Sequence, residues 1–242
     1  LNAFGRSGPG QEAAEPEVLA EPGFEEFASE FPGAASTGTA VMPVFDPLSG
    51  YNRAMFRFND KFFYWVAKPM TRGYGFVVPE PGRVAIRRAF HNLKFPLRFV
   101  NSLLQLKFKK AVSEVGCFAV NSTAGVAGLF DPAGRWLKWH TSNEDFGQTF
   151  AFYGVGPGFP GVLPLLGQTT LRDGIAMVPN FVVNPIYYIE GFTTNFALAS
   201  GEQFNFVSLY SREYESIKKD ALDPYTFIRD AYLQQREKDI RE

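Results

Sequence analysis

The sequence has few of the residues that bind metals or carry nucleophilic catalysis. It contains one cysteine, Cys117, and two histidines, His91 and His140, among 242 residues. One thiol cannot form an intrachain disulfide, and the histidines lie 49 positions apart without a cysteine pair or acidic cluster at ligand spacing. We therefore expect no metal site and no cofactor. Cys117 is expected to be a small buried residue, and the histidines surface or capping residues.

Catalytic motifs are also lacking. Neither histidine accompanies a nucleophile signature such as G-x-S-x-G. The glycines of residues 154–158 invite comparison with a phosphate loop, but the Lys-Ser/Thr pair of a P-loop is absent. The strand-to-helix context of a dinucleotide fingerprint is not predicted there either, so a flexible turn is the preferred interpretation. The sequence therefore predicts no enzyme.

Long apolar runs are missing too, although aromatic residues are abundant. No stretch approaches the roughly 18 uninterrupted apolar residues of a spanning helix. Yet the chain has 26 Phe, 10 Tyr and 3 Trp, with a mean hydropathy of -0.12 and 20% charged residues. Apolar rings mixed with charge indicate elements with one or two apolar faces. A membrane role would thus mean helices that lie in the interface or are embedded as a bundle.

Charge divides the chain into two parts. Residues 1–45 hold seven acidic residues, one basic residue and five prolines, which predicts a mostly disordered acidic tether. The remaining 18 acidic and 23 basic residues give residues 46–242 a net charge of +5. A mildly basic body suits an anionic membrane surface. The chain opens at Leu1 without a methionine, and we interpret it as a processed or trimmed form.

The first helix is predicted to begin at Asp46-Pro47 and to end before Pro69. It carries two apolar strips. The wide strip comprises Tyr51, Ala54, Met55, Phe58, Phe62, Trp65 and Val66, and the narrow strip comprises Phe56 and Phe63. One strip can face a protein core, and the other must meet a neighbouring helix or lipid.

Further helices follow from capping signals and periodicity, which predict an all-α fold. The region 96–121 should break at 106–110, Ser142 or Asn143 should cap a helix that ends at Phe152, and Thr169 or Thr170 should cap the next. Residues 181–199 are aromatic with Glu190 as the lone charge, and Asp223-Pro224 predicts a final polar helix. One small hairpin near 154–166 is the expected exception.

Several segments together resemble a known family, the VacJ/MlaA outer-membrane lipoproteins. The similar blocks are residues 46–60 (DPLSGYNRAMFRFND), 99–105 (FVNSLLQ), 121–131 (NSTAGVAGLFD), 144–149 (EDFGQT), 153–158 (YGVGPG), 163–173 (LPLLGQTTLRD), 223–225 (DPY) and 229–232 (RDAY). They run in order across roughly residues 46–237, and 163–173 is the most specific.

The resemblance implies a fold and a function. Members are helical rings around a central amphipathic channel, seated in the inner leaflet of the outer membrane. They remove mislocalised phospholipids from the outer leaflet and pass them to a periplasmic shuttle (MlaC-like), which maintains lipid asymmetry. Porin trimers are partners of some members. The resemblance therefore implies that residues 46–242 form a membrane-embedded phospholipid-transport domain.

Residue roles follow from the same resemblance. Arg57, Phe58 and Asn59 match a segment implicated in controlling the channel, so we expect them to affect gating. Members also carry a lipidated cysteine at the mature N-terminus, whereas residue 1 here is Leu and Cys117 is internal. Without that anchor, attachment of this chain would depend on its helices.

Two further sets of residues match. Gly154, Gly156 and Gly158 match a loop beside the channel, where glycine would allow a hinge. Arg172 and Asp173 lie in the best-matching block. For this pair an ion pair or cap at a helix start is favoured over direct head-group contact, and both interpretations stay open.

Two other functions compete with lipid translocation. A non-transporting outer-membrane scaffold or porin-binding adaptor would have the same amphipathic helices without an open polar channel. A lipid-modifying enzyme is disfavoured because no nucleophile and base are evident.

Overall fold

The computed structural model describes residues 44–189 and 191–242, so the predicted tether lies almost entirely outside the described residues. The first elements are α2 (Ser49–Phe62), the π-helical turn η3 (Phe63–Ala67), α3 (Lys68–Val77), α4 (Glu80–Leu93), α5 (Phe95–Leu104) and α6 (Phe108–Thr123). Then come the π-helical turn η4 (Ala133–Leu137), α7 (Phe146–Phe152), β1 (Pro160–Leu163), β2 (Gly167–Thr170) and α8 (Leu171–Val183). The 3₁₀ turn η5 (Pro185–Tyr188), α9 (Phe192–Asp220) and α10 (Pro224–Arg241) complete the described chain.

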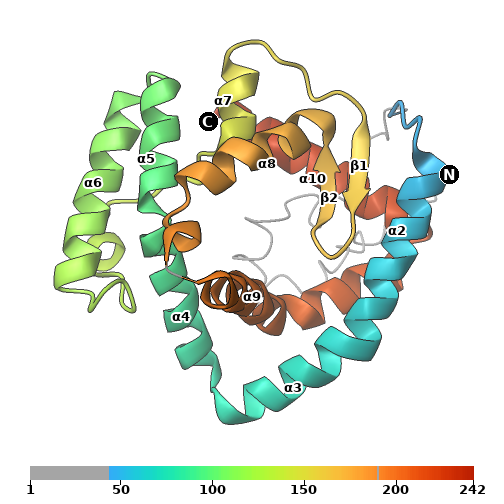
Figure 1. Ribbon diagram of the computed structural model, residues 1–242, viewed down its shortest axis with the longest axis horizontal. Helices are drawn as coiled ribbons and strands as arrows, with labels where there is room; N and C mark the ends of the chain where they lie inside the picture. Colours follow the sequence, from blue (N-terminus) through green and yellow to red (C-terminus); the bar gives the residue numbers. More distant parts are fainter. Residues whose placement is uncertain (1–43, 190) are drawn as a thin grey trace, which may run out of the picture.

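The elements form a ring, as Figure 1 shows. Helices α2, α3, α4, α5 and α8 follow one another around it, and the β1–β2 hairpin lies between α8 and α2. Packing of α4 on α5, α5 on α8, α8 on β2 and α2 on β1 closes the circuit. Helix α6 packs on α5, and α10 packs on α7 and β2. The predicted all-α ring with one small hairpin is confirmed.

Helix α2 does not begin at Asp46 as predicted. The Asp46 carboxylate instead accepts hydrogen bonds from the Asn52 amide and the Tyr225 hydroxyl, and it lies 3.6 Å from the Arg229 guanidinium. A carboxylate occupied by partners from α10 cannot cap the nearby helix start, and the helix begins at Ser49.

The predicted end before Pro69 is also wrong, because the helix continues through η3 into α3. The Lys68 N–H bonds to the Phe63 carbonyl, five residues back, which is the wide π-helical spacing. Pro69 then falls in the first turn of α3, where the chain tolerates its missing N–H. The turn η3 thereby carries the chain from α2 into α3 without a loop.

Most other boundaries follow local signals. The break between α5 and α6 is confirmed, and Leu106 at the break has a positive φ of 58°. Thr170 and Asp223 cap α8 and α10, as predicted, by accepting from the backbone N–H three residues on. Helix α7 ends at Phe152 as predicted, but its cap is Asp145 and not Ser142 or Asn143.

The hairpin is antiparallel and lies further along the chain than residues 154–166. Its register pairs Pro160 with Thr170 and Leu163 with Gly167. Leu165, in the tight turn, has a φ of +64°. The turn therefore uses residues 164–166, and the glycine-rich stretch serves as the connection from α7.

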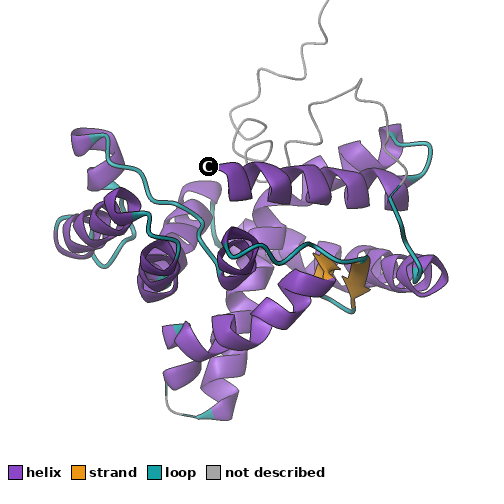
Figure 2. Ribbon diagram, turned by 90° about the horizontal axis from the view of Figure 1, so that it is seen from above, coloured by secondary structure: helices purple, strands orange, loops and turns teal. Residues whose placement is uncertain are grey.

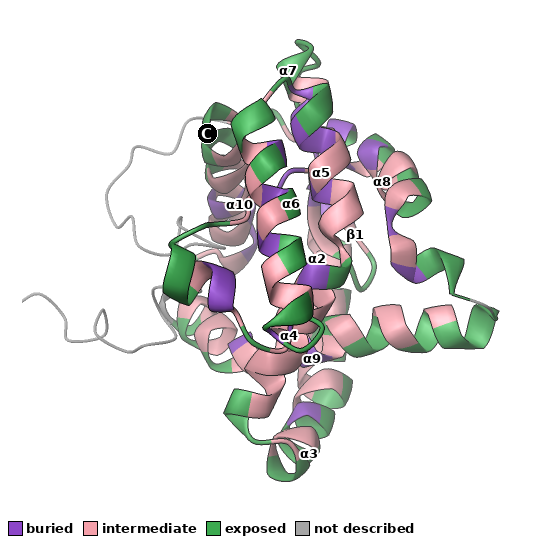
Figure 3. Cartoon of the chain, turned by 90° about the vertical axis from the view of Figure 1, so that its left-hand side faces the viewer, coloured by how far each residue is buried: buried purple, intermediate pink, exposed green. Residues whose placement is uncertain are grey.

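The interior is unusually polar for a helical protein. Among the described residues, nineteen polar or charged side chains are buried against nine apolar ones, and four of those nine are alanines. Large apolar side chains lie on the outside instead. Figure 3 shows that most helices carry exposed segments. In the described part of the chain, no helix is both long and apolar enough to cross a membrane.

Helices α9 and α10 mark two sides of the ring. Helix α10 runs along one side and ends at the C-terminus, as Figure 2 shows. The start of α9 projects on the opposite side (Figure 3). The molecule therefore has a strongly polar helix on one side and, on the other, an aromatic extension.

Candidate functional site

The junction where α2 meets the hairpin closes the ring, and two asparagines make it. The Asn52 amide donates to the Pro160 carbonyl at 3.1 Å and accepts from the Val162 N–H at 2.9 Å. Two turns further along α2, the Asn59 amide likewise donates to one backbone group and accepts from another in the next part of the hairpin. These side chains supply the donors and acceptors that a neighbouring strand would supply, so they satisfy the free edge of β1.

Asn59 contacts the turn of the hairpin. Its Nδ2 donates to the Leu163 carbonyl at 2.9 Å, and its Oδ1 accepts from the Leu165 N–H at 2.8 Å. The hairpin turn is therefore fixed to α2 through one residue of the predicted gating segment. Two asparagines seven positions apart, which place both amides on one helix face, are the sequence signal for this junction.

The other two gating candidates point elsewhere. Arg57 is exposed and makes no ion pair with the described residues, and Phe58 is half-exposed. Successive residues are rotated by about 100° around a helix axis, so the three side chains cannot share one contact. The structure brings only Asn59 onto the hairpin, and a role of all three in gating stays a prediction.

The two apolar strips of α2 have opposite surroundings. The narrow strip faces the protein, with Phe56 edge-on to Tyr225 and Phe63 edge-on to Tyr214 at centroid distances of 5.9 and 4.8 Å. The wide strip faces outward, where Trp65 is 77% exposed. The exposed apolar surface continues along α3 to Phe76, which is 94% exposed. The wide strip is thus the one that must meet an apolar medium.

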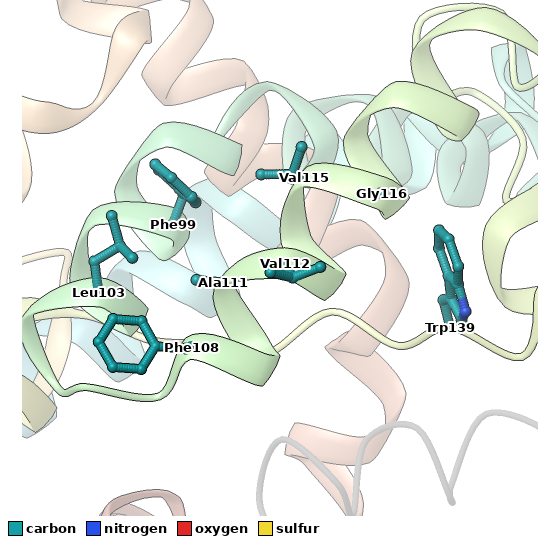
Figure 4. Close-up of a pocket in the computed structure, with 8 residues that line it drawn as sticks. All are labelled: Phe99, Leu103, Phe108, Ala111, Val112, Val115, Gly116 and Trp139. Carbon is teal, nitrogen blue, oxygen red and sulfur yellow. The ribbon is translucent and has the colours of Figure 1, made fainter.

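A second apolar surface lies between α5 and α6. It forms an open groove of about 480 Å³, lined by Phe99, Leu103, Phe108, Ala111, Val112, Val115, Gly116 and Trp139 (Figure 4). The Trp139 ring covers Gly116 so closely that a Cβ there would lie 2.3 Å from a ring carbon. Only glycine at this position lets the indole form one wall of the groove.

The predicted hinge loop joins α7 to β1 and is exposed throughout. Gly154 and Gly158 have positive φ values of 87° and 69°, which side chains disfavour, whereas Gly156 does not. A Cβ at Gly158 would meet Leu171 at 2.8 Å, while nothing lies within 4 Å of one at Gly154. Arg172 holds the loop, because its Nη1 donates to the Val155 carbonyl at 3.3 Å. A hinge role for the three glycines stays a prediction.

Arg172 and Asp173 lie in a buried ion network. Asp173 accepts from Arg236 at 2.9 Å and from the Tyr232 hydroxyl at 2.9 Å, and Arg172 lies 3.3 Å from it. Arg236 also donates to Asp145, the cap of α7, at 3.0 Å. The network joins α7, α8 and α10. This placement fits the ion-pair interpretation, and head-group contact by the pair stays a prediction.

The charges of this network reinforce one another. Burial alone would raise the pKa of Asp173, but the hydrogen bonds and charge of Arg236 hold that pKa below its ordinary value. The two carboxylates in turn raise the pKa of Arg236 despite its burial. Both groups are therefore charged at neutral pH. Sequence reasoning missed Arg236 because its partners lie 63 and 91 positions away.

A second buried pair joins α5 to α6. Arg98 donates from Nε to Glu114 at 2.9 Å, and Glu114 also accepts from the Ser142 N–H. His91, expected at the surface or as a cap, is partly buried beside them, and its Nε2 lies 2.8 Å from the Thr141 hydroxyl. Burial and the charge of Arg98 lower the pKa of His91 to about 3, so the ring is neutral.

Within the described ranges, no three His, Cys, Asp or Glu side chains are grouped so that they could hold a metal ion. Cys117 is buried, as predicted, and burial raises the pKa of its thiol. The main feature of the site is its distribution of side chains: polar and charged ones are buried inside, and large apolar ones are exposed outside.

The comparisons with known proteins agree with this geometry. The family model described as MlaA lipoprotein matches residues 44–239. The chain belongs to the MlaA lipoprotein family. An uncharacterised protein of Rickettsia bellii is 34% identical over 203 residues, covering 82% of this chain and 78% of the relative.

Relatives with a described role are somewhat more distant. The intermembrane phospholipid transport system lipoprotein MlaA of Escherichia coli is 29% identical over 219 residues, covering 85% of this chain and 82% of the relative. A solved structure, described as the structural basis for maintenance of bacterial outer membrane lipid asymmetry, superposes with a TM-score of 0.72 and 28% identity. It covers 81% of this chain and 99% of the solved one. The ring is therefore the fold of the MlaA family.

Proposed function

We propose that this chain is the outer-membrane component of a phospholipid transport system. In this role it takes mislocalised phospholipids from the outer leaflet and passes them to a periplasmic shuttle, which maintains lipid asymmetry. The observation that carries the proposal is the reversed polarity of a MlaA-family ring, with polar and charged side chains inside and large apolar ones outside. Such a molecule is stable only where its exterior meets lipid.

The ring would be seated in the periplasmic leaflet of the outer membrane. The wide strip of α2, with its continuation along α3, would lie against acyl chains. Arg57, Lys61 and Arg72 on the same two helices are exposed and make no ion pair with the described residues, so they are available to phosphate groups. A polar channel through the ring would carry the head group while the tails stay in apolar surroundings.

Gating would take place where the hairpin meets α2. Asn59 fixes the hairpin turn to the helix, and the glycine loop precedes the other end of the same hairpin. A change in these contacts would move the hairpin relative to α2. The lipid would leave chemically unchanged, because transport needs neither a nucleophile nor a metal. A MlaC-like shuttle would receive it, and a porin trimer is a second proposed partner.

The test is lipid transfer from vesicles. The full chain would be reconstituted into phospholipid vesicles, mixed with a purified shuttle protein, and the shuttle-bound lipid identified by mass spectrometry. Intact phospholipid on the shuttle is the expected result. Chemically altered lipid would point to an enzyme. Vesicles that bind porin but pass no lipid would overturn the proposal in favour of an adaptor.

A matched pair of charge variants tests the role of Arg57. Arg57→Glu should reduce the rate of transfer several-fold, because it reverses the charge next to the gating junction. Arg212→Glu is the control, since Arg212 is equally an exposed cation without an ion pair to the described residues, but on α9. Equal rates for both variants would contradict gating by Arg57.

A further inference from the structure

One segment of the ring is almost free of charge. Residues 174–201 contain a single charged residue, Glu190, although charged residues make up 20% of the chain. The segment comprises α8 after its first residues, the turn η5 and the first part of α9. Ion pairs fix both of its ends. Asp173, just before the segment, pairs with Arg236, and Glu202, just after it, pairs with Lys94.

This segment forms a helical hairpin that projects from the ring. Figure 3 shows α8 descending to the start of α9 on the side away from α10. Its surface is apolar. The exposed large side chains are Ile175, Val178, Phe181, Val182, Tyr187, Tyr188, Ile189, Phe192 and Phe196. Phe192, at the tip, is 83% exposed and stacks on Phe196 with a centroid distance of 6.3 Å.

Side chains satisfy three backbone groups near the tip. The Tyr188 hydroxyl donates to the Val182 carbonyl at 2.5 Å, and the Asn195 amide donates to the Tyr187 carbonyl at 3.1 Å. The Asn184 side chain accepts from the N–H two residues on. Hydrocarbon offers no water to replace such bonds, so irregular backbone is tolerated there only when protein groups satisfy it.

The length of the hairpin matches one leaflet. From Phe192 to Glu202, α9 rises about 15 Å at 1.5 Å per residue. The hydrocarbon core of a bilayer is about 30 Å thick, so one leaflet contributes about 15 Å. A charged end held at one interface therefore places the aromatic tip near the midplane. The hairpin is too short to cross the membrane, in keeping with the absence of a spanning helix in the described residues.

We propose that the α8–η5–α9 hairpin, residues 174–201, inserts into the hydrocarbon to about the bilayer midplane and places Tyr188 and Phe192 against the acyl-chain ends of the opposite leaflet. This inference rests on the proposed function, because it needs the ring to be seated in one leaflet. The opposite leaflet is the one from which mislocalised phospholipid is taken. The hairpin therefore gives the ring a direct contact with the chains of its cargo leaflet.

Depth-dependent quenching tests the insertion. In a full-length Cys117→Ala background, Phe192→Cys and, separately, Tyr188→Cys would be labelled with a fluorophore and reconstituted into phosphatidylethanolamine–phosphatidylglycerol vesicles. Nitroxide lipids labelled at carbon 12 should quench both sites at least twofold more than lipids labelled at carbon 5. Glu237→Cys on α10 is the control and should be quenched by aqueous iodide. Stronger quenching of the tip labels by carbon-5 lipids, or by iodide, would overturn the proposal.

The same vesicles separate this proposal from the proposed function. Lipid transfer to the shuttle with a shallow tip would overturn the insertion and leave transport standing. A deep tip without transfer would support the insertion and count against transport.

Discussion

Replacing Asn52 should open the ring at the junction of α2 with the hairpin. Asn52 is fully buried and satisfies two backbone groups of β1, the Pro160 carbonyl and the Val162 N–H. Asn52→Ala leaves both without a partner in a place that water does not reach. Each such group costs about 1–3 kcal/mol, so the variant should lose about 2–6 kcal/mol of stability. Asn59→Ala should lose only about 1 kcal/mol, because its partners lie where water can replace the amide.

Hydrogen exchange in detergent gives the most direct measurement. Loss of at least 2 kcal/mol should make the Val162 amide of Asn52→Ala exchange about 30-fold faster or more, since each 1.4 kcal/mol is about tenfold. The thermal midpoint should fall in the same order, with Asn52→Ala below Asn59→Ala. Asn143→Ala, at an exposed position, is the control and should stay within about 0.5 kcal/mol. Unchanged protection of the Val162 amide in Asn52→Ala would refute this account of ring closure.

Three further predictions concern the rest of the site. Gly147→Ala should destabilise the junction of α7, α8 and α10 by more than an ordinary surface change, because its Cβ would lie 2.3 Å from an Asp173 oxygen and 2.5 Å from an Arg236 nitrogen; a thermal midpoint equal to that of the parent chain would contradict this. Because folding lowers the pKa of Asp173, this carboxylate stabilises the fold at pH values above its ordinary pKa of 3.8. That contribution is lost as the pH falls through the lower pKa of the folded state. Denaturation scans below pH 4 should therefore show that the free energy of unfolding falls more steeply with pH for the parent chain than for Asp173→Asn. Gly154→Val should slow lipid transfer, since φ is +87° there, and Gly156→Val less so; outer-leaflet phospholipid levels that stay normal in both variants would count against a hinge.

Some features of the chain were predictable because their causes are local. The caps of α8 and α10 depend on a hydroxyl or carboxylate that reaches an N–H three residues away. The break at Leu106 and the two strips of α2 likewise follow from neighbouring residues. The family followed from ordered blocks of sequence, which carry the ring architecture with them. Which strip of α2 faces outward did not follow, because both are apolar.

The tertiary structure decided what depends on distant partners. Asp46 was predicted as a cap, but Tyr225 on α10, 179 positions away, binds it instead. Asn52 and Asn59 are seven positions apart and so share one helix face, yet only the fold places a strand edge against them. His91 becomes neutral because helix packing buries it beside Arg98. By itself, the sequence determined which faces are apolar and where α8 and α10 start. Only the fold decided which polar groups meet inside the ring, because those partners are brought together by packing rather than by spacing.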